Sequence, residues 1–223
     1  MTAATAFAPV VLFDLDGTLV DSAVDLLNAL NRILLRDGRA ALSVHAIRPV
    51  VSKGARAMLG VAFADLEAQE REAFLQPFLD AYAEAVADHS TPFDGIEDVL
   101  QAIEAAGSRW GIVTNKPLYL ARGVVASMGW HGRCAVLLGG DSLPRKKPDP
   151  DQLFEACALL GVAAGECVYV GDDERDVIAA QRAGMKSVAA LWGYREAHED
   201  PRDWKPCVLA ELPRDLLREG ALG

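Results

Sequence analysis

Residues 9–19 read PVVLFDLDGTL, a short apolar run that ends in two aspartates and a glycine. The apolar part, Pro9–Phe13, is rich in β-branched residues and does not alternate with polar ones. This pattern predicts a strand buried on both faces, as in parallel sheets. Four later runs have the same character: Trp110–Val113, Ala135–Leu138, Cys167–Val170 and Ser187–Leu191.

Helical periodicity separates these later runs. It covers Ile96–Ala106, Leu118–Met128, Asp151–Leu160 and Glu174–Ala183. Strands that alternate with helices predict a parallel sheet with helices on both faces. We therefore expect an α/β protein with a Rossmann-like sheet core.

The segment between the first two strands breaks this alternation. From Asp21 to Phe93 no strand is expected, and the pattern is helical over Val44–Val51, Ala55–Phe63 and Leu66–Ala87. A first helix is expected to begin after Ser22, which can cap it together with Asp25, three residues further on. The apolar face of this helix would consist of Ala23, Leu27, Leu30 and Leu34. We predict an inserted all-helical cap domain at 21–92, in a core made of 1–20 and 93–223. The alternative, one long crossover, is less favoured because a crossover usually needs a single helix.

The length and composition are those of a folded protein with one sizeable hydrophobic core and a small second module. The chain has 223 residues, 51% of them hydrophobic, and its 22 Lys and Arg against 32 Asp and Glu give a net charge of −10. Such an acidic chain is not expected to bind nucleic acid or an anionic membrane, because phosphates need a basic surface. An anionic ligand would need local cations or a metal ion.

The cysteines and the N-terminal stretch predict a cytoplasmic protein. None of Cys134, Cys157, Cys167 and Cys207 forms a C-x-x-C pair, so reduced core thiols are expected. No Lys or Arg precedes Arg32, which argues against a signal peptide. No apolar run approaches the length of a membrane span.

Acidic side chains follow two of the predicted strands. Asp14 and Asp16 come directly after the first strand, and two carboxylates about 4 Å apart repel by roughly 4 kcal/mol at an effective dielectric constant near 20. A divalent cation would remove this repulsion, although an aspartate turn closed by Gly17 explains the pattern nearly as well. Asp172 follows another buried strand and Asp176 lies one helical turn on, so both can join the same oxygen site. Asp173 and Glu174 are expected to be solvated.

Two further polar groups lie where ligands bind in open α/β sheets. Thr114 and Asn115 can donate hydrogen bonds to phosphate oxygens, although a polar loop start is the simpler explanation. Lys147 precedes Pro148 on a stiff loop and can point at an anion or belong to a solvated basic patch.

Together these motifs resemble the haloacid-dehalogenase superfamily of phosphohydrolases. DxDGTL at 14–19, VTN at 113–115, KP at 147–148 and GDxxxD at 171–176 occur in the order of that family. The resemblance implies that Asp14 is the nucleophile and that Asp16 is the general acid and base. It also implies phosphate binding by Thr114, Asn115 and Lys147, and Mg²⁺ held by Asp14, the main-chain carbonyl of Asp16, Asp172 and Asp176. The partner would be a small phosphoester.

Other segments resemble narrower branches. WGY at 192–194 and EDPxxW at 199–204 are similar to phosphoglycolate phosphatases. VSKGARAML at 51–59, PFDG at 92–95 and WGIVTNKP at 110–117 are similar to the N-acetylmuramic acid 6-phosphate phosphatases of peptidoglycan recycling. The resemblance implies N-acetylmuramic acid 6-phosphate as the substrate, with phosphoglycolate as the alternative. A sugar phosphomutase or a non-catalytic binding protein are alternatives of other classes.

Both candidate substrates carry a carboxylate besides the phosphate. Lys53 and Arg56 form a compact basic site in the predicted cap, so either can meet that carboxylate or simply end a solvated helix. Trp192, Tyr194 and Trp204 are expected to pack the tail onto the core. Lys116 receives no role, and the sequence does not predict an oligomeric state.

Overall fold

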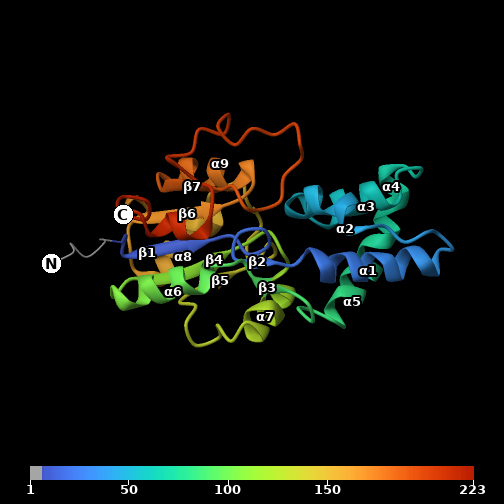
Figure 1. Ribbon diagram of the computed structural model, residues 1–223, viewed down its shortest axis with the longest axis horizontal. Helices are drawn as coiled ribbons and strands as arrows, with labels where there is room; N and C mark the ends of the chain where they lie inside the picture. Colours follow the sequence, from blue (N-terminus) through green and yellow to red (C-terminus); the bar gives the residue numbers. More distant parts are fainter. Residues whose placement is uncertain (1–6) are drawn as a thin grey trace.

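A six-stranded parallel sheet forms the core of the protein (Figure 1). The computed structural model describes residues 7–223, so residues 1–6 of the predicted core range lie outside the described residues. The strand order is β5-β4-β1-β6-β7-β8. The strands are β1 (Val10–Phe13), β4 (Arg109–Val113), β5 (Leu137–Leu138), β6 (Cys167–Gly171), β7 (Lys186–Ala190) and β8 (Val208–Ala210). The predicted α/β fold is confirmed.

Strand β1 lies inside the sheet between β4 and β6, and all four of its residues are fully buried. Val11 and Phe13 pack into one apolar cluster, with helices α6 (Ile96–Ala105) and α7 (Leu118–Ser127). Val10 and Leu12 pack into the other, with α8 (Asp151–Leu160) and α9 (Glu174–Ala183). The sheet therefore has helices on both faces, which explains why β1 shows no alternation of apolar and polar residues.

The short strands differ from the expectation. β5 covers only the second half of the predicted run 135–138. β8 pairs with β7 at the sheet edge and was not predicted, because it has three residues and Leu209 in its middle is 41% exposed. The expectation that Asp21–Phe93 holds no strand is wrong at its two ends, where β2 (Val20–Asp21) and β3 (Thr91–Pro92) form a short antiparallel pair.

A helical cap region lies between β2 and β3 and forms a separate group beside the sheet in Figure 1. It has its own apolar cluster, in which side chains such as Leu30, Met58 and Phe78 are buried. Its elements are α1 (Ala23–Arg36), α2 (Val44–Ile47), η1 (Arg48–Lys53), α3 (Ala55–Ala62), α4 (Ala68–Arg71), η2 (Glu72–Phe74) and α5 (Leu75–Ala83). The domain boundary at 21–92 stays a prediction.

One continuous helix over Leu66–Ala87 is wrong, because the structure divides the segment into α4, η2 and α5. Pro77 gives the physical reason. It has no backbone N–H to donate, and a new helix that begins at Leu75 places it in the first turn, where no such donor is needed.

The described part of the chain contains no helix long and apolar enough to cross a membrane. The four cysteines are free thiols. Cys157 and Cys167 are buried, Cys134 is half-buried and Cys207 is exposed, so the expectation of core thiols is wrong for Cys207.

The start of α1 is fixed by long-range contacts in place of the predicted capping box. The Ser22 side chain makes no capping bond, and its hydroxyl donates to Asp16 at 2.5 Å. The Asp25 carboxylate is buried and accepts hydrogen bonds from the backbone N–H groups of His89 and Ser90 and from the Ser90 hydroxyl. Asp25 therefore ties α1 to the segment that returns from the cap.

These contacts give Asp25 a pH-dependent contribution to stability. Burial raises the pKa of the Asp25 carboxyl, but the hydrogen bonds from Ser90 and His89 outweigh burial and lower it below its usual value of 3.8. The folded protein thus favours the charged form. The resulting stabilisation is present above the unfolded pKa and is lost as the pH falls through the lower folded pKa.

We expect Asp25→Asn to lower the free energy of unfolding by about 1–3 kcal/mol at pH 7, because buried backbone donors lose an ionised acceptor. The difference from the wild type should shrink between pH 5 and pH 2. Urea unfolding across this range measures it, with the exposed Asp88→Asn as the matched control. A difference that stays constant down to pH 2 would contradict the assignment.

Candidate active site

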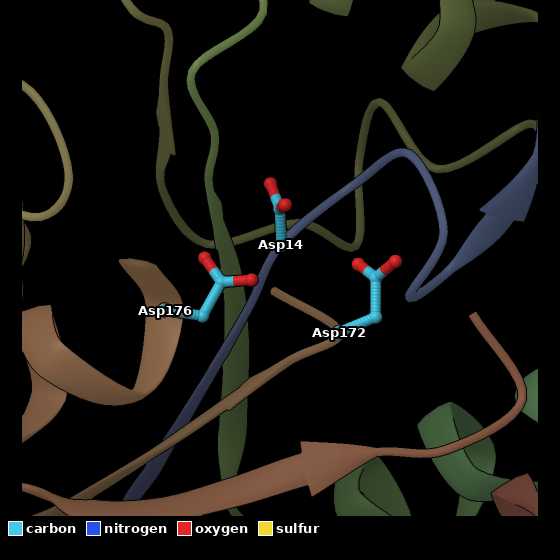
Figure 2. A group of neighbouring side chains, drawn as sticks. All are labelled: Asp14, Asp172 and Asp176. Carbon is cyan, nitrogen blue, oxygen red and sulfur yellow. The ribbon is translucent and has the colours of Figure 1, made fainter. Parts of the chain in front are cut away.

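Three buried carboxylates meet at the carboxyl edge of the sheet. Asp14 directly follows β1, Asp172 directly follows β6, and Asp176 lies in the first turn of α9. One oxygen from each lies within 4.8 Å of the others. Figure 2 shows the three side chains grouped around one space. The parallel strands thus bring together three of the four aspartates that were expected in one oxygen site, and the fourth, Asp16, is not in the cluster.

The loop after β1 needs Gly17 for two reasons. Its φ of +86° lies in the left-handed region that disfavours residues with a Cβ. A Cβ at this position would also overlap the carboxylate of Asp172. The glycine therefore lets the Asp14 loop approach the β6 loop closely.

Lys147 places one positive charge inside the carboxylate cluster. Its buried ammonium lies 2.7 Å from Asp176 Oδ1 and 3.0 Å from Asp14 Oδ1, and it donates to the Tyr169 hydroxyl at 2.7 Å. Burial lowers the pKa of Lys147, but Asp14 and Asp176 outweigh burial and raise it. Lys147 is therefore charged, and the three carboxylates, when all are ionised, exceed its charge by two negative charges.

The remaining negative charge makes the site suited to a divalent cation. Burial raises the pKa of Asp172 well above its usual value, and Asp14 and Asp176 raise it further. Burial also raises the pKa of Asp176 to about 6, although Lys147 opposes the rise. Asp14 Oδ1 is buried, and although the Lys147 ammonium lies 3.0 Å away, the two groups are not aligned as a hydrogen bond. Carboxylate oxygens with an unused acceptor fit a hard cation such as Mg²⁺.

The Asp16 side chain lies apart from this cluster. Its oxygens accept from Lys116 Nζ at 2.9 and 3.0 Å, and Oδ1 also accepts from Ser22. Lys116 is buried, and its ammonium contacts the Tyr82 hydroxyl of the cap at 2.9 Å. Burial lowers the pKa of Lys116, but Asp16 and Tyr82 raise it. Residue spacing could not predict the pair of Lys116 and Asp16, because the two residues are 100 positions apart.

Thr114 and Asn115 lie at the end of β4, as the strand pattern predicts. Thr114 is buried, and its hydroxyl accepts from the Lys116 backbone N–H at 3.2 Å. The Asn115 side chain donates to the Lys147 carbonyl at 2.9 Å, while its Oδ1 is buried without a donor from the described residues. Asn115 therefore fixes the loop that carries Lys147.

A pocket of about 310 Å³ lies between this sheet edge and the cap. Asp14, Asp16 and Thr114 line its polar side. The cap side is largely apolar and is lined by Leu26, Val51, Met58, Leu75, Phe78, Leu79 and the Tyr82 ring. The pocket thus offers a polar, charged end and a largely apolar end to a bound molecule.

The two basic cap residues line the pocket but are already paired. Lys53 donates to Asp173 Oδ2 at 2.7 Å and also to Glu199, while Arg56 pairs with Glu72 on the exposed surface. The expectation that Asp173 is solvated is wrong, because Lys53 covers it and its side chain caps α9. The sequence could not predict this contact, because Lys53 lies 120 residues before Asp173.

Tyr194 does more than pack the tail onto the core. Its hydroxyl accepts from the Ser22 backbone N–H at 2.8 Å and donates to Asp21 at 2.6 Å. Its backbone N–H donates to Asp172 at 2.9 Å, and its ring packs in the cap cluster and under Arg48. The tail therefore contacts both the cap hinge and the carboxylate cluster.

Comparisons with known proteins agree with this geometry. The family model described as haloacid dehalogenase-like hydrolase matches residues 11–190. A protein of Xanthomonas campestris pv. campestris named phosphoglycolate phosphatase is 53% identical over 215 residues, which cover 96% of this chain and 97% of that protein. A Pseudomonas aeruginosa protein named N-acetylmuramic acid 6-phosphate phosphatase is 40% identical over 208 residues, which cover 93% and 92%.

A solved structure supports the same relationship. The crystal structure of a predicted phosphoglycolate phosphatase from Haemophilus somnus 129PT matches with a TM-score of 0.84 and 28% identity, over 94% of this chain and 96% of that one. The chain therefore belongs to the haloacid dehalogenase-like hydrolase family and is a phosphatase of that family.

Proposed function

We propose that the protein is a Mg²⁺-dependent phosphomonoesterase that forms a phosphoaspartate on Asp14. The observation that carries the proposal is the place of the Asp14 carboxylate, which lies beside the Lys147 ammonium, in the cluster of three aspartates and at the wall of the pocket. Because Asp14 lines the pocket, its carboxylate can reach the phosphorus of a phosphate bound there. Asp14, the Asp16 main-chain carbonyl, Asp172 and Asp176 would hold Mg²⁺, which when bound supplies positive charge for the phosphate oxygens.

In the first step, an Asp14 oxygen forms a bond to phosphorus while the bond from phosphorus to the ester oxygen breaks. Asp16 gives a proton to the departing oxygen. Lys147, Thr114 and Asn115 orient the phosphate in line with Asp14, and the Lys147 charge reduces the repulsion between two anions.

In the second step, water attacks the phosphorus of the phosphoaspartate. Asp16 accepts a proton from this water, the bond between Asp14 and phosphorus breaks, and inorganic phosphate leaves. Asp14 is then a free carboxylate again, and Asp16 carries a proton again, as it did before the first step. A phosphomutase would instead return the phosphoryl group to the sugar, so the release of inorganic phosphate separates the two functions.

The relatives favour phosphoglycolate as the substrate, since the 53% identical protein is named phosphoglycolate phosphatase. The second candidate is N-acetylmuramic acid 6-phosphate, because the 40% identical protein is named as a phosphatase of that compound. The apolar cap side of the pocket favours this larger substrate, because a two-carbon glycolate offers it no apolar group. Participation in peptidoglycan recycling and a cytoplasmic location stay predictions.

We expect Asp14→Asn to lower kcat at least about a thousandfold, because an amide replaces the attacking carboxylate. Phosphate release from phosphoglycolate measures the loss, and ³²P-labelled substrate should label the wild-type chain but not the variant. Asp88→Asn, an exposed aspartate of the same chemistry, is the control. Full turnover by Asp14→Asn would remove Asp14 as the nucleophile.

A substrate panel tests the reaction and the cation together. We expect EDTA to abolish phosphate release from both named phosphoesters and added Mg²⁺ to restore it. Of the two, phosphoglycolate should give the higher kcat/KM if the more similar relative shares its substrate. A clear preference for N-acetylmuramic acid 6-phosphate would reverse the order of the two candidates, and no release from any phosphoester would favour a non-catalytic protein.

Replacement of Arg56 tests whether this residue contacts the substrate carboxylate, as the sequence predicts. Its side chain is 66% exposed and pairs with Glu72, so it would have to leave this partner to reach a ligand. If it does, Arg56→Ala should raise KM for both phosphoesters about tenfold and leave kcat nearly unchanged. Arg71→Ala, also in the cap, is the control. Unchanged kinetics would remove Arg56 from the substrate site.

A further inference from the structure

Ser52 brings a hydroxyl group of the cap to the carboxylate cluster of the core. It lies near the end of η1, and its Oγ donates to Asp172 Oδ2 at 2.7 Å. The two residues are 120 positions apart in the chain. Because Asp172 is buried and belongs to the candidate cation site, this hydrogen bond connects the position of the cap to that site.

The hydrogen bonds to Asp172 distinguish its two oxygens. Oδ2 accepts from Ser52 and from the Tyr194 backbone N–H, which use both of its lone pairs. Oδ1 accepts only from the Thr18 hydroxyl, at 2.9 Å. One lone pair of Oδ1 therefore stays available for a cation, while Oδ2 is held in place.

The backbone around Asp172 leaves little room for the carboxylate to turn. A Cβ at Gly17 or Gly193 would overlap its side chain, so both glycines lie directly against it. Of the three donors, Thr18 and Tyr194 belong to the core, and Ser52 alone comes from the cap region. Opening of the cap would therefore remove one of the two hydrogen bonds that hold Oδ2.

The Ser52 backbone is itself held against the core. The Arg175 guanidinium donates to the Ser52 carbonyl, and the neighbouring Lys53 contacts Asp173 and Glu199. Arg175 and Asp173 lie at the start of α9, the helix that also carries Asp176. Ser52 thus reaches Asp172 as part of a closed junction between cap and core.

We propose that Ser52 is a positioning residue for Asp172 and that its hydrogen bond links closure of the cap to the affinity for the divalent cation. This inference rests on the cation site of the proposed function. Groups that orient a metal-binding carboxylate typically change metal affinity 10–100-fold when removed. By linkage, a cap contact that strengthens cation binding is itself strengthened by the cation to the same degree.

Titration with Mn²⁺ alone, followed by electron paramagnetic resonance of the free ion, tests the proposal without turnover. Ser52→Ala should raise the Kd for Mn²⁺ about tenfold. Ser52→Thr keeps the hydroxyl and should stay within about twofold of the wild type. Ser43→Ala removes an exposed cap hydroxyl that makes no capping bond and should leave the Kd unchanged. Circular dichroism and urea unfolding show whether each variant is folded.

Amide hydrogen exchange measures the reverse effect on the cap. Saturating Mn²⁺ should slow exchange across residues 50–56 in the wild type and Ser52→Thr, and much less in Ser52→Ala. An unchanged or lower Kd in a folded Ser52→Ala variant would overturn the proposal. So would a Ser52→Thr variant as weak as Ser52→Ala. If the wild type binds no Mn²⁺, the cation site of the proposed function fails as well, whereas binding that ignores Ser52 overturns only the present inference.

Discussion

The rest of the structure depends on the crowding of like charges at one buried edge of the sheet. Asp14, Asp172 and Asp176 lie within a few ångströms of one another, and water is largely excluded from them. A folded protein tolerates such an arrangement only with compensating charge or protonation. Lys147 supplies part of the charge and leaves the site negative. The whole chain, with a net charge of −10, disfavours binding to polyanionic surfaces. The carboxylate cluster is a local concentration of the same negative charge, and it favours a small cation.

The sheet explains why this crowding arises and is maintained. β1 and β6 are adjacent and parallel, so the residues that follow them leave the sheet at the same edge. The capping interactions of α9 then fix Asp176, whose Oδ2 accepts from the Asp173 backbone N–H at 3.0 Å. Gly17 allows the first loop to approach closely. The acidic site is therefore built by backbone geometry, and its side chains have little freedom to move apart.

The sequence is informative about the parts of this arrangement that depend on local patterns. Apolar runs that end in polar residues identify β1, β4 and β6, and with them Asp14, Thr114 and Asp172. Contacts between residues far apart in the sequence could not be predicted in this way. Lys116 reaches Asp16, Lys53 reaches Asp173, and Asp25 binds the return segment instead of capping α1. Each of these partners is at least 64 residues away, and residue spacing carries no information at that range.

The cap and the core share the same acidic residues, and this sharing gives the cap a role beyond enclosing the pocket. Asp172 accepts from Ser52, Asp173 from Lys53, and Asp16 from Lys116, which in turn contacts Tyr82 of the cap. Movement of the cap away from the core would leave buried carboxylates with fewer donors, at a cost in free energy. Cations, substrates and the cap therefore act on one set of negative charges. The Ser52 hydroxyl of the cap donates to Asp172, and Asp172 also belongs to the proposed cation site, so closure of the cap and cation binding would act on the same carboxylate.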